Sequence, residues 1–231
     1  MWLAGFDPGG VDQFGWCVAE ATPVHPLTLH MTGIASNAAE AVDCVLKVVP
    51  SQATLTAAGI DSPLFWSIDG DRNADRVVRD RIKELGASAP SGTVQHVNSL
   101  RGACLAQGLI AAKLLQAAVP SICVTEAHPK ALLWFLGIAT RQKPVKSITM
   151  RDLSEFFLSL PGDYTEHERD AALASLGAWA MMGKASGWED LFELENQPFV
   201  PVPPVAYWMP SMPSNQAFVP SGSNIPKRRS S

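Results

Sequence analysis

The sequence lacks several features that would assign it to a specialised class of protein. It has four cysteines in 231 residues, none of them in a C-x-x-C pair, so neither a disulfide scaffold nor a cysteine-rich zinc site is indicated. Its longest apolar stretch, residues 102–119, is interrupted by Gln107, Lys113 and Gln116, which favours a buried helix over a membrane span. A strand-like pattern begins almost at Met1, so we expect no signal peptide. These absences predict a globular cytoplasmic protein with reduced thiols.

An excess of positive charge is also lacking. The formal net charge is −4 at pH 7, and only 17% of the residues are charged. Proteins that coat nucleic acid without specificity neutralise its phosphates with many lysines and arginines, so the composition argues against that class. It does not exclude a nuclease, because bound divalent ions supply positive charge where the bond is cleaved. The 47% of hydrophobic residues suffices for one sizeable core.

Patterns of hydrophobic residues predict the order of the secondary-structure elements. We expect strands over residues 2–7, 14–19, 27–34, 55–61 and 122–126, and helices over residues 38–49, 71–85, 99–118, 130–136, 149–158 and 166–182. The three early strands are joined by short connections, which favours an antiparallel meander, whereas helices separate the later strands. The fold class that follows is α/β, with a mixed five-stranded sheet that carries helices on both faces.

The C-terminal part of the chain differs in composition from the rest. We expect one domain over residues 1–195 and a Pro/Ser-rich tail over residues 196–231. Such a density of proline is unfavourable in helices and in central strands. The tail is therefore expected to be disordered or to lie on the surface, with the alternative that its aromatic residues fasten part of it to the domain.

Three acidic residues stand where a predicted strand ends. Asp7 precedes a Pro-Gly-Gly turn, Asp61 precedes Ser-Pro, and Glu126 closes the apolar strand at residues 122–126. If these strands are neighbours, their carboxylates lie side by side and repel one another unless a cation is bound. Each acid could instead accept hydrogen bonds from a nearby turn, which is a common structural role.

A fourth acidic residue, Asp170, lies in the helix predicted over residues 166–182. Thr165 and Glu168 have the spacing of a capping box, so Glu168 is expected to be structural. His167 and Asp170 are three residues apart and share a face that continues with small alanines. Asp170 would be an unpaired buried charge unless a cation faced it. His167 is either a ligand or proton carrier, or a solvated residue at the helix start.

A stripe of basic residues follows Asp61. It consists of Arg72, Arg76, Arg79 and Lys83. This stripe is a candidate phosphate-binding surface for nucleic acid. Asp75 lies four residues before Arg79, and that spacing equally suits an ordinary salt-bridged face exposed to solvent.

Several short motifs resemble those of known nuclease families. LAGFDPG at residues 3–9 and HERDAALA at residues 167–174 resemble the first strand and the closing helix of RuvC-type Holliday-junction resolvases. GIDSPL at residues 59–64 and EAHP at residues 126–129 are similar to a family of predicted nucleases, the domain of unknown function 429. The resemblance implies a ribonuclease-H-like fold with metal chemistry. Since RuvC-type enzymes have Glu where Asp61 stands, it does not imply junction resolution.

The hypothesis that follows is a divalent-metal-dependent nuclease that hydrolyses phosphodiester bonds of DNA or RNA. The proposed ligands of Mg²⁺ or Mn²⁺ are Asp7, Asp61, Glu126 and Asp170, with two ions sharing carboxylates and with Glu126 or His167 peripheral or carrying protons. One alternative is a catalytically silent binding module of the same fold. Another is a nucleotide-binding protein like actin or the sugar kinases, which need two domains where this chain has room for one. A homodimer is left open.

Overall fold

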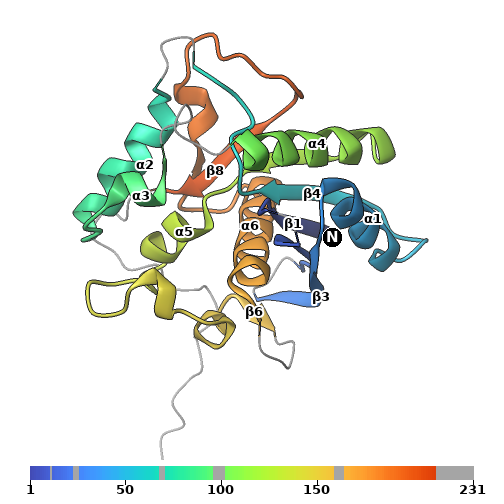
Figure 1. Cartoon of the computed structure of the whole chain (residues 1–231), viewed down its shortest axis with the longest axis horizontal. Helices are drawn as coiled ribbons and strands as arrows, with labels where there is room; N and C mark the ends of the chain where they lie inside the picture. Colours follow the sequence, from blue (N-terminus) through green and yellow to red (C-terminus); the bar gives the residue numbers. More distant parts are fainter. Residues whose placement is uncertain (11, 23–25, 68–70, 96–101, 159–163, 212–231) are drawn as a thin grey trace, which may run out of the picture.

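A central sheet organises the molecule (Figure 1). The computed structural model describes residues 1–10, 12–22, 26–67, 71–95, 102–158 and 164–211. The first three strands, β1 (Trp2–Asp7), β2 (Phe14–Glu20) and β3 (Leu27–Ala35), form an antiparallel meander. On the other side of β1 lie β4 (Leu55–Ile60) and then β5 (Cys123–Glu126), both running in the direction of β1.

The predicted fold class is confirmed, although the number of strands is larger. The order β3-β2-β1-β4-β5, with β2 antiparallel to its neighbours and β4 and β5 parallel to β1, is the ribonuclease-H-like arrangement. The described sheet has eight strands instead of five. The additional strands are β6 (Phe157–Leu158) beside β3, β8 (Ala206–Pro210) beside β5, and β7 (Trp188–Asp190) beside β8. All three are short, so they leave little periodic signal in the sequence.

Helices cover both faces of this sheet (Figure 1). One face carries α6 (Glu166–Gly183), α5 (Pro129–Phe135) and α2 (Asn73–Glu84), and the other carries α1 (Ala38–Val48) and α4 (Gly102–Ala118). Among the described residues, the remaining helical segments are the short α3 (Pro90–Thr93) and the 3₁₀ turns Val145–Ser147, Met150–Leu153 and Leu191–Leu194. Residues alternate between the faces as a strand requires: Leu3 packs on the α6 side and Ala4 on the α1 side.

The long helix α6 lies very close to the sheet because glycines line its path. A Cβ atom on Gly5 of β1 would lie 1.8 Å from the carbonyl oxygen of Ala171, and one on Gly59 of β4 would lie 1.9 Å from that of Ala174. No side chain fits at either position without moving the helix. The small alanines on this face of the helix, Ala171 and Ala174 among them, allow this close approach.

The start of α6 is fixed by the predicted capping box. The Thr165 hydroxyl accepts a hydrogen bond from the backbone N–H of Glu168, and the Glu168 carboxylate accepts one from the backbone N–H of Thr165. The first turns of the helix carry His167 and Asp170, so this cap fixes the helix register on which their positions depend.

Part of the segment expected to be a tail forms a strand inside the sheet. Tyr207 and Met209 of β8 are fully buried, and the backbone N–H of Trp208 donates to the Thr125 hydroxyl at 3.0 Å. Within residues 196–211 the prolines stand before this strand or at its last position, Pro210, so its interior keeps the N–H groups that pairing needs. Residues 212–231 of the expected tail lie outside the described residues.

The helix predicted over residues 149–158 is wrong. A 3₁₀ turn, Met150–Leu153, forms there instead and is closed by a capping box between Thr149 and Asp152. The chain then runs into β6, where Phe157 pairs with Leu27 of β3. Pairing with the edge of the sheet overrides the helical preference of this segment.

None of the four cysteines forms a disulfide bond in the described structure. Of the helices in the described part of the chain, none has the length and apolar character needed to cross a membrane.

Candidate metal centre

Asp7 and Asp61 lie on neighbouring strands at the same edge of the sheet. The backbone N–H of Asp61 donates to the carbonyl of Phe6 at 2.9 Å, which continues the parallel pairing of β1 and β4 to the ends of both strands. Because successive residues of a strand face opposite sides, Asp7 faces the same side as Gly5, and Asp61 the same side as Gly59. Both carboxylates are thereby directed to the side of α6.

Helix α6 brings His167 and Asp170 to this edge. His167 Nδ1 donates a hydrogen bond to Asp7 Oδ2 at 2.5 Å. Asp170 is only 1% exposed, and its Oδ1 accepts hydrogen bonds from Arg169 Nε at 2.8 Å and Nη2 at 2.6 Å. Lys130 Nζ lies 3.9 Å from the other oxygen, Oδ2. The cation that a buried Asp170 requires is thus supplied by Arg169, a side chain of the protein itself.

The three aspartates lie within one another's electrostatic influence. Burial, followed by the charges of Asp7 and Asp170, raises the pKa of Asp61 well above its usual value. Burial raises the pKa of Asp170 to about 7; Asp7 adds to this rise and Arg169 opposes it. The hydrogen bond with Asp7 raises the pKa of His167. A group of oxygen donors that repel one another fits a hard divalent cation such as Mg²⁺ or Mn²⁺, which would offset the repulsion.

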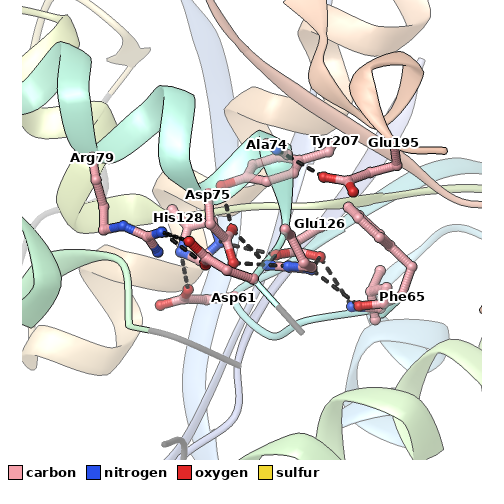
Figure 2. A network of polar contacts seen from close by, with 12 residues as sticks. Asp61, Phe65, Ala74, Asp75, Arg79, Glu126, His128, Glu195 and Tyr207 are labelled. Atoms are coloured by element: carbon pink, nitrogen blue, oxygen red, sulfur yellow. Dashed lines mark hydrogen bonds and ion pairs between the residues drawn. The ribbon is translucent and has the colours of Figure 1, made fainter. Parts of the chain in front are cut away.

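Glu126 lies in a different environment, a buried ion-pair network (Figure 2). Arg72 Nη1 donates to its Oε2 at 2.7 Å, and Arg72 Nη2 donates to its Oε1 at 2.6 Å. The backbone N–H of Leu64 also donates to Oε2, at 3.0 Å. Burial alone would raise the pKa of Glu126, but the charge of Arg72 lowers it to about 2. Both oxygens of Glu126 are therefore already engaged by protein groups.

The placement of Arg72 corrects its predicted role in binding phosphate. Its side chain is fully buried, pairs with Asp75 and Glu126, and lies over the ring of Phe65 at 4.5 Å. A side chain without exposed surface cannot contact a nucleic acid. The physical reason is its position: Arg72 precedes α2 as its N-cap residue, so it does not share the solvent-facing side of that helix.

The other basic residues of the stripe belong to α2 and differ in their partners. Arg79 Nη2 donates to both carboxylate oxygens of Asp71, at 2.6 and 2.8 Å. The salt-bridged alternative named the wrong partner, because Asp75 pairs with Arg72 instead. Arg76 and Lys83 are exposed. A phosphate contact by these two residues remains a prediction.

A second group of possible metal ligands consists of two carboxylates, Asp75 and Glu126, and the imidazole of His128. One potential ligand atom from each of these side chains lies within 4.8 Å of the others. Arg72 donates hydrogen bonds to both of these carboxylates. Its guanidinium therefore already supplies the positive charge that a metal ion would bring. The other candidate is the set Asp7, Asp61 and Asp170, although among the described residues these three do not bring one oxygen each within 4.8 Å of one another.

His128 links the network to the candidate centre, as Figure 2 shows. Its Nε2 lies 2.9 Å from Glu126 Oε1, and its Nδ1 lies 4.0 Å from Asp61 Oδ1. The ring also packs against Tyr207 of β8, with 5.2 Å between the ring centroids. Through these contacts, the buried network fixes a basic side chain beside Asp61.

Three basic residues at or beside the centre did not stand out in the sequence: His128, Lys130 and Arg169. His128 and Arg169 lie within the motifs at residues 126–129 and 167–174, and Lys130 directly follows the first of these, but the sequence assigned none of them a role. A position next to an acidic residue in the sequence does not reveal where a side chain points. The contacts of these three residues are therefore visible only in the folded structure.

No protein-family model matches the chain, and no curated protein matches its sequence. Among solved structures, the chain is similar to RuvC of Thermus thermophilus, with 19% sequence identity and a TM-score of 0.42 over 79% of this chain and 97% of that one. A second similar structure is T. thermophilus RuvC in complex with a Holliday junction substrate, with 18% identity and a TM-score of 0.36 over 80% of this chain and 98% of that one. The resemblance of residues 59–64 and 126–129 to the domain of unknown function 429 stays a prediction.

Proposed function

We propose that the chain is a divalent-metal-dependent nuclease that hydrolyses phosphodiester bonds of DNA or RNA in the cytoplasm. The observation that supports this proposal is that Asp7 and Asp61 end neighbouring strands and that their charges and that of Asp170 act on one another in buried surroundings. When bound there, Mg²⁺ or Mn²⁺ supplies a Lewis acid that activates water and stabilises the charge on the phosphate.

The protein's own residues have distinct roles in this proposal. Asp7, Asp61 and Asp170 hold the ion. His167 orients Asp7 through its hydrogen bond to Oδ2 and holds a proton at Nδ1 beside the site, because its pKa is raised by that bond. Glu126, first expected to be a ligand, is assigned to the ion-pair network that places His128 beside Asp61.

A catalytically silent binding module is the second candidate. It is favoured by the burial of Arg72 and the pairing of Arg79 with Asp71, which remove two of the four expected phosphate contacts. The nucleotide-binding alternative requires two domains that enclose the nucleotide, whereas the described residues contribute one central sheet.

The test is incubation of the protein with Mn²⁺ and a panel of single-stranded, double-stranded and branched DNA and RNA. We expect cleavage of at least one substrate, loss of cleavage in EDTA, and loss in the variant Asp7→Asn with its fold retained. Asp43→Asn changes an exposed aspartate on α1 and serves as the matched control. If the protein binds Mn²⁺ and cleaves nothing, the silent module is correct. Stabilisation by ATP and not by Mn²⁺ would favour the nucleotide-binding alternative.

A further inference from the structure

The first part of the connection between α5 and β6 carries only positive charge (Figure 1). From Ala127 to Arg151 the sequence has no Asp or Glu, whereas it has five lysines and arginines. Four of these lie within residues 141–151, which we call the basic segment: Arg141, Lys143, Lys146 and Arg151. Because the net charge of the chain is −4, this segment is a local concentration of positive charge in an acidic protein.

Three of the four bases in this segment have no partner in the described part of the chain. Arg141, Lys146 and Arg151 are exposed, and no ion pair or side-chain hydrogen bond joins them to another described residue. Lys143 differs, because its ammonium group pairs with Asp152. The charge of the other three side chains is therefore available to a partner outside the chain.

The backbone of the basic segment has a defined position. The Ser147 hydroxyl donates to the carbonyl of Pro144 at 2.8 Å, and the capping box between Thr149 and Asp152 closes the following turn. Ile148 is 3% exposed and packs in the core on the side of the sheet that α6 covers. Local hydrogen bonds and one core contact thus hold the exposed bases on an ordered surface.

Arg169 joins the basic segment to Asp170. Its Nη1 donates to the carbonyl of Ile148 at 2.8 Å and to that of Val145 at 3.4 Å. Its Nε and Nη2 donate to Asp170 Oδ1, at 2.8 and 2.6 Å. Lys146 lies between the two carbonyl acceptors in the sequence. One buried guanidinium group therefore fixes the backbone around Lys146 next to an acid of the candidate metal centre.

The other end of the segment meets the end of α2. Arg141 lies against Gly86, since a Cβ atom on this glycine would be 2.9 Å from Nε of Arg141. The backbone N–H of Gly86 donates to the carbonyl of Lys83, an exposed base of the stripe predicted on that helix. The basic segment thus extends from the neighbourhood of Asp170 to Lys83.

The chemistry of the segment suits the phosphate backbone of a nucleic acid. Lysine and arginine side chains bind it by neutralising phosphates, and they need no particular base sequence to do so. Attachment to a lipid surface usually also requires apolar side chains that insert between the lipids. Here Ile148 is buried, and Val145 and Met150 are only partly exposed. A nucleic acid is therefore the partner that the segment fits better.

We propose that the basic segment binds the phosphate backbone of DNA or RNA through Lys146 and Arg151, and so holds a strand beside the candidate metal centre. This inference rests on the proposed nuclease function, because it concerns the substrate of that same site. Contacts to phosphates position a nucleic acid without reading its bases. The segment therefore contributes affinity and orientation, and not sequence specificity.

The test is the salt dependence of binding to fluorescein-labelled oligonucleotides, measured by fluorescence anisotropy in EDTA, where metal-dependent cleavage is prevented. Single-stranded and duplex DNA and RNA form the separate arms. The double variant Lys146→Gln with Arg151→Gln removes two phosphate contacts. On duplex DNA, the slope of log affinity against log salt concentration should become shallower by about 1.8, at about 0.9 for each contact.

The matched control is the double variant Lys47→Gln with Lys113→Gln. It removes two exposed positive charges from α1 and α4, on the opposite face of the sheet, and so changes the net charge by the same amount. Its salt slope should equal that of the wild-type protein. This control separates binding at the basic segment from a general effect of net charge.

An unchanged slope in the Lys146 and Arg151 variant, or an equal change in both double variants, would overturn the role of the segment. If the wild-type protein still cleaves a substrate with Mn²⁺, the nuclease proposal survives that result. A shallower slope without any cleavage would support the segment and remove the nuclease. Should the double variant fail to fold, Lys146→Gln alone should make the slope shallower by about 0.9. Binding to phosphatidylserine vesicles and to no oligonucleotide would show a lipid surface as the partner and overturn the inference.

Discussion

Raising the pH should destabilise the metal-free protein over a range in which carboxylates usually favour folding. The pKa of Asp170 is about 7 in the folded protein, against an ordinary value of 3.8. Between these values the folded protein keeps the proton that the unfolded chain has lost, so the free energy of unfolding falls as the pH rises. Asp61 acts in the same direction, because its pKa is also raised.

The expected size of this effect follows from the Asp170 shift. Over a pH range in which the folded state binds one proton more than the unfolded state, each pH unit changes the free energy of unfolding by about 1.4 kcal/mol. The opposite contribution of Glu126, whose pKa is lowered from 4.5 to about 2, is confined to pH values below 4.5. From there up to the Asp170 pKa, Asp170 alone should remove about 3 kcal/mol. That corresponds to roughly 6 to 12 °C in melting temperature for a chain of this length.

The assay is thermal unfolding in EDTA across this pH range, with the variant Asp170→Asn as the comparison. The substitution removes the negative partner of Arg169 and so changes the melting temperature by a similar amount at every pH. It does not change how the melting temperature depends on pH through Arg169. The variant should therefore show a clearly flatter dependence on pH. A wild-type melting temperature that rises with pH, or an equal slope in the two proteins, would refute the raised pKa of Asp170 that burial and the charge of Asp7 produce.

The remaining predictions concern the fold that supports the centre, and each is measured by chemical denaturation. Tyr207→Ala should lower the free energy of unfolding by about 3 to 5 kcal/mol, because this ring is fully buried; a change below 1 kcal/mol would mean that β8 is dispensable. Arg72→Ala should cost about 3 to 5 kcal/mol, since it leaves two buried carboxylates without their partner, whereas Arg76→Ala on the exposed face should change stability by at most about 0.5 kcal/mol. Gly5→Ala should lower the free energy of unfolding by about 1 to 3 kcal/mol or more, because its Cβ would lie 1.8 Å from a carbonyl oxygen of α6. Gly102→Ala is the control and should be tolerated, because its Cβ would meet no atom within 4 Å.

The elements nearest the candidate centre could be predicted from the sequence because their signals are local. The first strand was expected at residues 2–7 and is found there, and the closing helix differs from its expected end by one residue. The capping box at Thr165 fixed the start of that helix in the pattern of residues alone. The strand Ala206–Pro210 was missed because it is stabilised by pairing with β5, a contact between distant segments that local composition cannot show.

The candidate site was predictable to the extent that strand ends and helix faces define it. Asp7 and Asp61 end neighbouring strands as their positions suggested, and Asp170 acts on both through its charge, while their role as metal ligands stays a prediction. Glu126 also ends a strand, but a buried arginine engages both of its oxygens. Arg72 was expected on the exposed face of a helix, but it precedes that helix as its N-cap residue. Its side chain points into the protein because folding brings its acidic partners there, and the sequence does not show this.

The most direct test of the central claim is a crystal structure of the protein grown with MnCl₂ at about pH 8, where Asp170 is ionised, with anomalous scattering recorded to locate the metal. The account predicts a manganese peak that contacts oxygens of Asp7, Asp61 and Asp170, with no peak at the cluster of Asp75 and Glu126. A manganese ion in that cluster in place of the three aspartates, or the absence of any peak at a concentration well above that needed for saturation in solution, would contradict it.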